Sequence, residues 1–135
     1  MKSLYRICLN EKNILKGGVE LNLNDMEKKA LEICEMIRSM FGERASTTNV
    51  YDVVDENGFH KFKIQFMAYN YFSIVFQYEN DIIGCSIECG TGQWVPLTLG
   101  MHCYSDENME FYFKEVMRNI ELRIPDKYLR ANGWI

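Results

Sequence analysis

The side chains that could do chemistry in this chain begin with a group of thiols and one imidazole. Cys85 and Cys89 lie four residues apart, and the pair His102-Cys103 follows farther along the chain. Thiolates and imidazoles can bind zinc, and a Cys–His pair can act as a nucleophile with its base. However, structural zinc sites take close cysteine pairs from tight turns, whereas residues four apart in one strand are roughly 13 Å apart. We therefore expect buried structural thiols, no metal site and no enzyme activity.

A second candidate is the carboxylate and imidazole of Asp55 and His60, on either side of an Asn-Gly pair at 57–58. Asn-Gly is a strong hairpin signal, because both central residues of a type I′ turn need positive φ, and this turn sets the two side chains opposite each other. Acid–base catalysis would also need a cleft and a nucleophile. The Gly-Thr-Gly segment 90–92 lacks the lysine of a phosphate loop. We expect a surface ion pair, a turn and no cofactor.

Length and composition predict a single domain over residues 1–135. The chain is 47% hydrophobic and 25% charged, which is ordinary for a globular protein that can bury its own core. No linker, repeat, secretory signal or apolar run of transmembrane length is visible, so no membrane partner is expected. An odd number of scattered cysteines suits reduced thiols. The predicted location is the cytoplasm.

Two segments have the apolar spacing of amphipathic helices. The first begins with Asn24 as N-cap and Glu27 three residues on, which is a capping box, and Gly42 ends it. The second is expected to start near Ser105, and Pro125 stops it because the residue before proline disfavours helical backbone. The tail after this proline is expected to form one more short helix.

Between the two helical segments, residues 50–101 alternate apolar and polar side chains with a period of two. Turns at 57–58, 69–71, 80–81 and 90–92 divide this region into five strands. Because a one-residue slip would move half of the apolar side chains to the wrong face, the apolar matching tests the register. The predicted pairs are Tyr51–Ile64, Val53–Phe62, Phe66–Ile74, Phe76–Cys85, Ile87–Val95, Cys85–Leu97 and Ile83–Leu99.

The predicted fold class is therefore α+β. It consists of a five-stranded antiparallel meander, with an N-terminal edge strand from residues 4–9 and two amphipathic helices packed on one sheet face. The opposite face mixes aromatic, Met and Val side chains with charges, and sets Glu88 opposite Trp94 and Asp52 opposite Lys63. Such mixtures are typical of interfaces. The alternative is that residues 1–20 cover this face, or that a second copy does so in a homodimer.

Charge is concentrated in the middle of the chain. The net charge of the whole chain is −4, whereas residues 45–113 carry nine acidic residues and two lysines, a net −7. This region repels nucleic-acid phosphates and favours a basic protein partner. The alternative is that the acids are solvated turn residues. The candidate partner-binding residues are Asp52, Asp55, Glu56, Tyr71, Glu79, Asp81, Glu88 and Trp94.

A short tail motif carries a resemblance. The chain is small, acidic and rich in cysteine and aromatic residues, and its tail contains the segment Ile124-Pro125-Asp126-Lys127-Tyr128-Leu129 followed by Gly133-Trp134. In these features it resembles the immunity proteins of bacterial polymorphic and contact-dependent toxin systems. The resemblance implies a stoichiometric inhibitor that covers the active site of a cognate toxin, often a basic nuclease. Acidic side chains would steer the association and exposed aromatics would anchor it.

Two other classes of function share features with this chain. A type III secretion chaperone is also small, acidic and α+β, but chaperones of that class interleave helices between groups of strands, whereas the five strands here run consecutively. A small-ligand-binding protein or an enzyme of unknown class would place its site in a pocket between helices and sheet. The neighbouring genes discriminate among the three classes. A toxin tail supports the immunity protein, a secreted effector supports the chaperone, and a metabolic operon would exclude both.

Overall fold

The computed structural model describes residues 6–7 and 23–135, so the predicted turn at 16–18, Cys8 and most of the predicted 4–9 strand lie outside the described residues. The elements within this part of the chain are β1 (Arg6–Ile7), α2 (Asp25–Phe41), a short 3₁₀ turn η2 (Gly42–Arg44), β2 (Asn49–Glu56), β3 (Phe59–Ala68), β4 (Phe72–Glu79), β5 (Ile82–Gly90), β6 (Gln93–Pro96), β7 (His102–Cys103), α3 (Met109–Glu121) and α4 (Asp126–Ala131).

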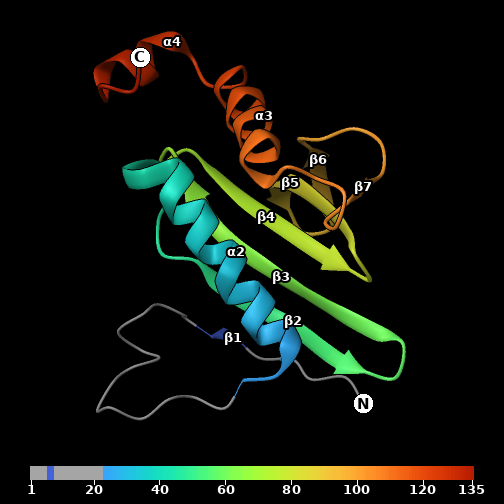
Figure 1. Cartoon of the computed structure of the whole chain (residues 1–135). Helices are drawn as coiled ribbons and strands as arrows, with labels where there is room; N and C mark the ends of the chain where they lie inside the picture. Colours follow the sequence, from blue (N-terminus) through green and yellow to red (C-terminus); the bar gives the residue numbers. More distant parts are fainter. Residues whose placement is uncertain (1–5, 8–22) are drawn as a thin grey trace, which may run out of the picture.

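The strands form one antiparallel sheet in the order β1-β2-β3-β4-β5-β6, and β7 pairs with β5. Figure 1 shows α2 lying over β2 and β3, with α3 beside it over the other half of the sheet. This arrangement confirms the α+β class, the five-stranded meander and the added edge strand. No helix in the described part of the chain is both long and apolar enough to cross a membrane.

Helix α2 starts and ends where the sequence predicts. The Asn24 side chain accepts a hydrogen bond from the Glu27 amide at 2.8 Å, and the Glu27 carboxylate accepts one from the Asn24 amide at 3.0 Å. This reciprocal pair satisfies two amides that the first turn leaves without helical partners. Gly42, with φ at +57°, ends the helix in a conformation that other residues rarely adopt.

Aromatic side chains join both helices to one sheet face. The Phe41 ring packs edge-on against Phe66 on β3 at 5.2 Å between centroids and against Phe113 on α3 at 6.3 Å. Phe113 also contacts Phe76 on β4 at 5.8 Å. All four rings are fully buried, so each contributes roughly 1.5–3 kcal/mol of burial free energy to one shared core.

The predicted start of the second helix near Ser105 is wrong. Helix α3 begins at Met109, with Asn108 as its N-cap. The reason is a competing interaction, because the amide and hydroxyl of Ser105 donate to the two carboxylate oxygens of Asp81 at 3.1 and 2.6 Å. These bonds hold residues 104–107 as a turn against the β4–β5 connection instead of a first helical turn.

A β-bulge in β2 makes its register differ from the predicted one. Between the pairs Tyr51–Lys63 and Val54–Lys61, Asp52 and the next residue face a single residue of β3. Asp52 has φ at +52°, which Asp tolerates better than most side chains. The predicted pairs Tyr51–Ile64 and Asp52–Lys63 are therefore wrong by one residue, whereas the predicted pair Val53–Phe62 agrees with the register of Val54 opposite Lys61. Val50, not Tyr51, lies opposite Ile64 and is fully buried.

The predicted fifth strand is also too long. It ends at Pro96, and the predicted pair Ile83–Leu99 does not form, because His102 of β7 occupies the position opposite Ile83. Leu99 is instead 85% exposed in the connecting loop. The predicted pairs Phe66–Ile74, Phe76–Cys85 and Ile87–Val95 occur as expected. Leu97 lies just beyond β6, and its backbone amide donates to the Cys85 carbonyl at 2.8 Å.

Candidate functional site

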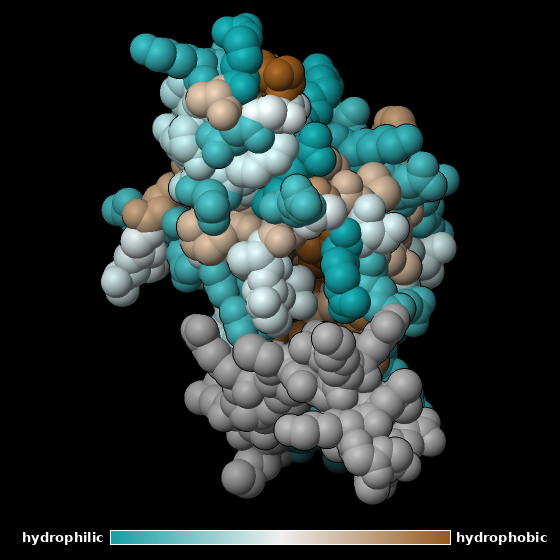
Figure 2. All heavy atoms as spheres, turned by 90° about the vertical axis from the view of Figure 1, so that its left-hand side faces the viewer, coloured by the Kyte–Doolittle hydropathy of each residue, from teal (hydrophilic) through white to brown (hydrophobic). Residues whose placement is uncertain are grey.

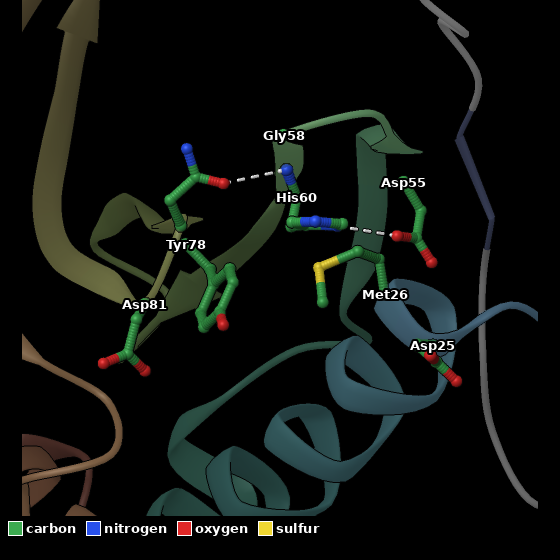
Figure 3. A pocket seen from close by; sticks show the side chains of 8 residues that line it. Asp25, Met26, Asp55, Gly58, His60, Tyr78 and Asp81 are labelled. Atoms are coloured by element: carbon green, nitrogen blue, oxygen red, sulfur yellow. Dashed lines mark hydrogen bonds and ion pairs between the residues drawn. The ribbon is translucent and has the colours of Figure 1, made fainter.

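An open hollow of about 550 Å³ lies at one end of the sheet, where two hairpin turns approach the first turn of α2. Figure 3 shows Asp25 and Asp81 on opposite rims, with Met26 and Tyr78 between them and Asp55 beside the His60 ring. Asn80 and Gly58 complete the lining. The hollow thus combines carboxylates from three separate elements with side chains of the buried core.

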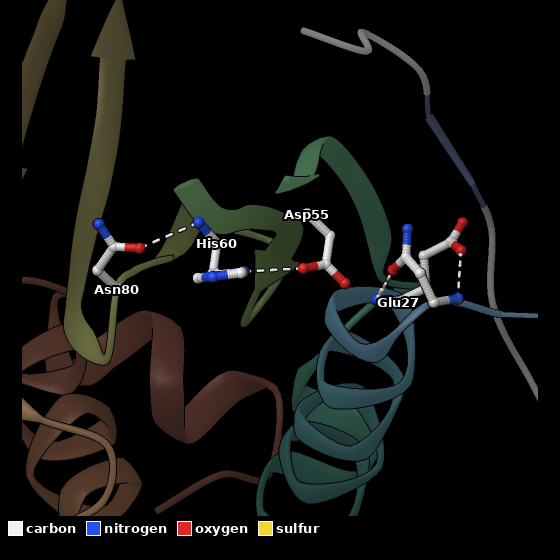
Figure 4. Close-up of polar contacts among 5 residues, drawn as sticks. Glu27, Asp55, His60 and Asn80 are labelled. Carbon is white, nitrogen blue, oxygen red and sulfur yellow. Dashed lines mark hydrogen bonds and ion pairs between the residues drawn. The ribbon is translucent and has the colours of Figure 1, made fainter. Parts of the chain in front are cut away.

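His60 fastens the two hairpins to each other. Its ring Nδ1 lies 2.8 Å from the Asp55 carboxylate, and its amide donates to the Asn80 side chain at 3.0 Å (Figure 4). The backbone N–H of Asn80 in turn donates to the backbone carbonyl of His60 at 2.8 Å. The predicted Asp55–His60 pair is confirmed, and it links β2, β3 and the β4–β5 turn at the edge of the hollow.

The turns around the hollow differ in backbone conformation. At 57–58 only Gly58 has positive φ, so the expected type I′ turn, which needs positive φ at both positions, does not form there. At 80–81 both Asn80 and Asp81 have positive φ, at 47° and 73°. Asp and Asn are the non-glycine residues that adopt this region most readily. The conformation orients the Asp81 carboxylate toward Ser105.

The floor of the hollow is aromatic. Tyr78 stacks on Phe62 with ring centroids 5.1 Å apart and meets Tyr104 edge-on at 6.0 Å. Burial raises the pKa of the Tyr78 hydroxyl, and the neighbouring Asp81 carboxylate raises it further, so the phenol stays neutral. No lysine or arginine of the described chain is among the lining residues, but the Lys29 ammonium lies beside the floor, 5.7 Å from the Tyr78 ring centroid and 4.7 Å from that of Tyr104.

The carboxylates of the hollow can accept hydrogen bonds from a cationic group. Among residues 6–7 and 23–135, no group of three or more His, Cys, Asp or Glu side chains is placed to hold a metal ion. The Asp55–His60 pair has no cysteine or serine within the lining to act as its nucleophile. The hollow is suited to receiving a positively charged side chain from another molecule.

The structure divides the eight predicted partner-binding residues into two groups. Asp55, Glu56, Glu79 and Asp81 gather at the hollow end, where the β2–β3 and β4–β5 turns lie. Asp52 lies close to that end in the β2 bulge, where its carboxylate is 3.5 Å from the Lys63 ammonium. We call these five side chains, together with Asp25, the acidic end of the sheet.

The other three predicted residues lie at the opposite end. Glu88 and Trp94 pair across β5 and β6, as predicted, and Trp94 is 44% exposed. Tyr71 precedes β4, and its ring packs against Tyr128 at 4.9 Å. At strand rise the length of β4 separates this aromatic end from the acidic end by roughly 23 Å. The eight residues therefore do not form one compact surface.

A row of hydrogen bonds crosses the outer face of the sheet near the aromatic end. Asn49 donates to Gln65 at 3.1 Å, Gln65 donates to Ser73 at 3.0 Å, and Ser73 donates to Glu88 at 3.2 Å. The row spans four neighbouring strands and stiffens this face. Val75, which the register predicts on the same face, is only 2% exposed, so the outer face is less apolar at its surface than expected.

Two residues at this end of the sheet were not predicted as candidates from the sequence, namely Asp25 of the acidic end and the neighbouring Phe59. Phe59, between the lining residues Gly58 and His60 in the chain, is 61% exposed at the hairpin tip. Its position directly after the Asn-Gly turn, opposite Glu56, was a usable signal, because an aromatic residue beside a turn has little sheet to cover it. Asp25 had no such signal, since only the packing of α2 on the sheet brings it to the hollow.

Large exposed apolar side chains are scattered over the described surface. They are Phe59, Tyr71, Ile82, Trp94, Leu99, Met101, Phe111, Leu122 and Ile135. On the face shown in Figure 2, hydrophobic atoms surface in small patches between hydrophilic side chains. A partner on such a surface would combine charge pairing with isolated apolar anchors.

The thiols are structural at two positions. Burial raises the pKa of Cys34 to about 11 and that of Cys85 to about 12, which keeps both in the unreactive thiol form. The expectation that all thiols are buried is wrong for Cys89, which is exposed. A register shift between Glu88 and Gly90 releases Cys89 from the alternation that buries Cys85.

Comparison with known proteins adds no relative: no protein-family model, curated protein or solved structure matches this chain. The site must therefore be interpreted from its own chemistry.

Proposed function

We propose that this chain is a non-catalytic protein-binding domain, namely a cytoplasmic immunity protein that binds and neutralises a basic cognate toxin domain. The observation that carries the proposal is the hollow at the acidic end. There, carboxylates from α2, β2 and the β4–β5 turn surround a floor of Met26 and Tyr78, and His60 pairs with Asp55, with no lysine or arginine among the lining residues of the described chain.

Charge at the hollow favours a basic partner. Asp55 already pairs with His60, and Asp81 already accepts from Ser105, yet each carboxylate oxygen has a second lone pair that can accept from an arginine or lysine. A surface of this sign raises the association rate of a basic protein, and it repels nucleic acid that competes for the same partner.

Phe59 supplies the apolar component that charge alone lacks. An aromatic side chain exposed at a hairpin tip and flanked by acids fits the pattern of interface hot spots, in which one buried anchor is surrounded by polar contacts. Burying its exposed part against a partner would contribute roughly 1–2 kcal/mol. The acidic end is thus the proposed toxin-binding surface, with Phe59 exposed at the tip of its β2–β3 hairpin.

Co-expression with the toxin domain encoded in the adjacent reading frame tests this function. The wild-type chain is expected to restore growth, and the double variant Phe59→Ala with Glu79→Lys is expected to bind the toxin domain at least tenfold more weakly and to lose protection. Both positions are exposed, so the fold should be unaffected.

Glu43→Lys makes the same charge change on the exposed 3₁₀ turn η2, outside the acidic end, and serves as the matched control. It is expected to protect as well as the wild type. If the wild-type chain neither rescues growth nor binds the neighbouring toxin domain, the proposal is wrong.

A further inference from the structure

A groove of about 480 Å³ runs between α2 and the start of α3, on the helical side of the molecule. Nothing in the proposed toxin-binding surface uses it. Its lining consists of three methionines, three glutamates and one serine: Met36, Met40, Met109, Glu32, Glu35, Glu110 and Ser39.

Helical periodicity explains this composition. Glu32, Met36 and Met40 follow one another at intervals of four along α2, so they form one row on a single helix face. Deeper in the molecule, Phe41 and Phe113 close the contact between the helices. The groove methionines pack only partly against this core, which leaves them partly accessible along the floor of the groove.

The groove has the two properties that a helix-binding groove needs. Methionine is unbranched and polarizable, so a methionine floor adapts to varied apolar side chains. The three glutamates supply a negative rim, and no lysine or arginine of the described chain lines the groove. Lys114 contacts Glu110 at 3.2 Å, but both side chains are more than half exposed, so this pair is readily exchanged.

We propose that the α2–α3 groove binds a basic amphipathic helical segment of a partner protein. Apolar side chains at helical spacing enter among Met36, Met40 and Met109, and flanking lysines or arginines pair with the glutamate rim. The same rim repels nucleic acids and anionic lipid surfaces, which leaves a cationic peptide as the partner that matches the groove in both charge and polarity.

A synthetic peptide of about 18 residues, long enough to hold a helix on binding, is the probe. It carries leucine at positions i, i+3, i+4 and i+7 and lysine at most others. With ¹³C-methyl-labelled methionine, the signals of Met36, Met40 and Met109 are expected to shift on titration. The signals of Met67 and Met101, outside the groove, should stay unchanged.

Charge reversal at the rim provides the second readout. Glu35→Lys, on an exposed position of α2, is expected to weaken peptide binding about tenfold at low salt, whereas the control Glu43→Lys leaves it unchanged. The inference is overturned if the groove methionines do not shift, or if a matched peptide with glutamate in place of lysine binds equally well.

The groove and the acidic end can fail separately. Glu35→Lys is expected to leave toxin neutralisation intact, because Glu35 does not line the hollow at the acidic end. A chain that rescues no toxin but binds the basic peptide in the groove would retain this inference and remove the immunity function.

Discussion

At the scale of single residues, the groups that first suggest catalysis have structural roles in the described chain. His60 links two hairpins. His102 places one ring nitrogen 3.2 Å from Glu107 and the other 2.8 Å from the Leu99 carbonyl, which fastens the loop before α3. Chemical reactivity of a side chain type is therefore a weak guide to function when a neighbouring acceptor satisfies it.

Cys34 makes a prediction about alkaline stability. Burial raises its pKa from 9.0 to about 11, so the unfolded chain loses the thiol proton at a lower pH than the folded chain. The stability contributed by the neutral thiol is complete below pH 9 and is lost as the pH rises toward 11, by at most roughly 3 kcal/mol.

Urea unfolding at pH 8 and pH 10.5 measures this effect. The wild type is expected to lose more stability between these two values than Cys34→Ala does, although the variant is less stable at both because of the cavity it leaves. Tyr69 and Tyr112, whose pKa values burial also raises, are common to both proteins and cancel in the comparison. Equal losses in the two proteins would show that Cys34 ionises normally in the fold.

At the scale of elements, the bulge in β2 is where local geometry overrides the regular register. Asp52 holds positive φ there, and the bulge turns Tyr51 out of the core, where its ring lies 6.0 Å from the Lys63 ammonium. The bulge therefore places the side chains of Asp52 and Tyr51 at partly exposed positions beside Lys63.

Substitution at Asp52 tests the importance of that conformation. Asp52→Val is expected to destabilise the fold by about 1–3 kcal/mol, because a β-branched residue is strained at positive φ. Asp52→Gly loses the same carboxylate but accepts the backbone, so it should cost much less. The two denaturation midpoints decide the question, and a similar loss in both variants would point to the Lys63 contact instead of the backbone.

The helices and strands differ in how accurately the sequence alone predicts their bounds and register. Helix α2 could be predicted to the residue, because the capping box and Gly42 are local signals. The three later hairpins could be registered because apolar matching permits only one alignment. The bulge and the start of α3 could not, since they depend on a tolerated φ at Asp52 and on hydrogen bonds from Ser105 to the distant Asp81.

The sequence predicts the candidate site less completely than it predicts the fold. The acids of the two turns could be named from their positions, and the register paired Asp55 with His60 correctly. The predicted meander also places Trp94, beside the turn at 90–92, at the other end of the sheet from the turns at 57–58 and 80–81. What could not be foreseen is that Asp25 joins the acids, because this depends on how α2 packs on the sheet.

At the scale of the whole molecule, the fold separates three surfaces. The acidic end lies at two hairpin turns, the aromatic end lies at the opposite ends of the same strands, and the methionine groove lies between the helices. One sheet with helices on a single face makes this possible, because the turns, the strand ends and the helix seam face different directions (Figure 1).

Hydrogen exchange of the chain, alone and in the presence of the proposed toxin partner, tests the central claim most directly. Binding is expected to slow exchange of backbone amides at 55–60 and 79–81, at the acidic end. Residues 88–94, roughly 23 Å away along β4, are expected to exchange as in the free chain. Slowed exchange confined to 88–94, with 55–60 unchanged, would contradict the account.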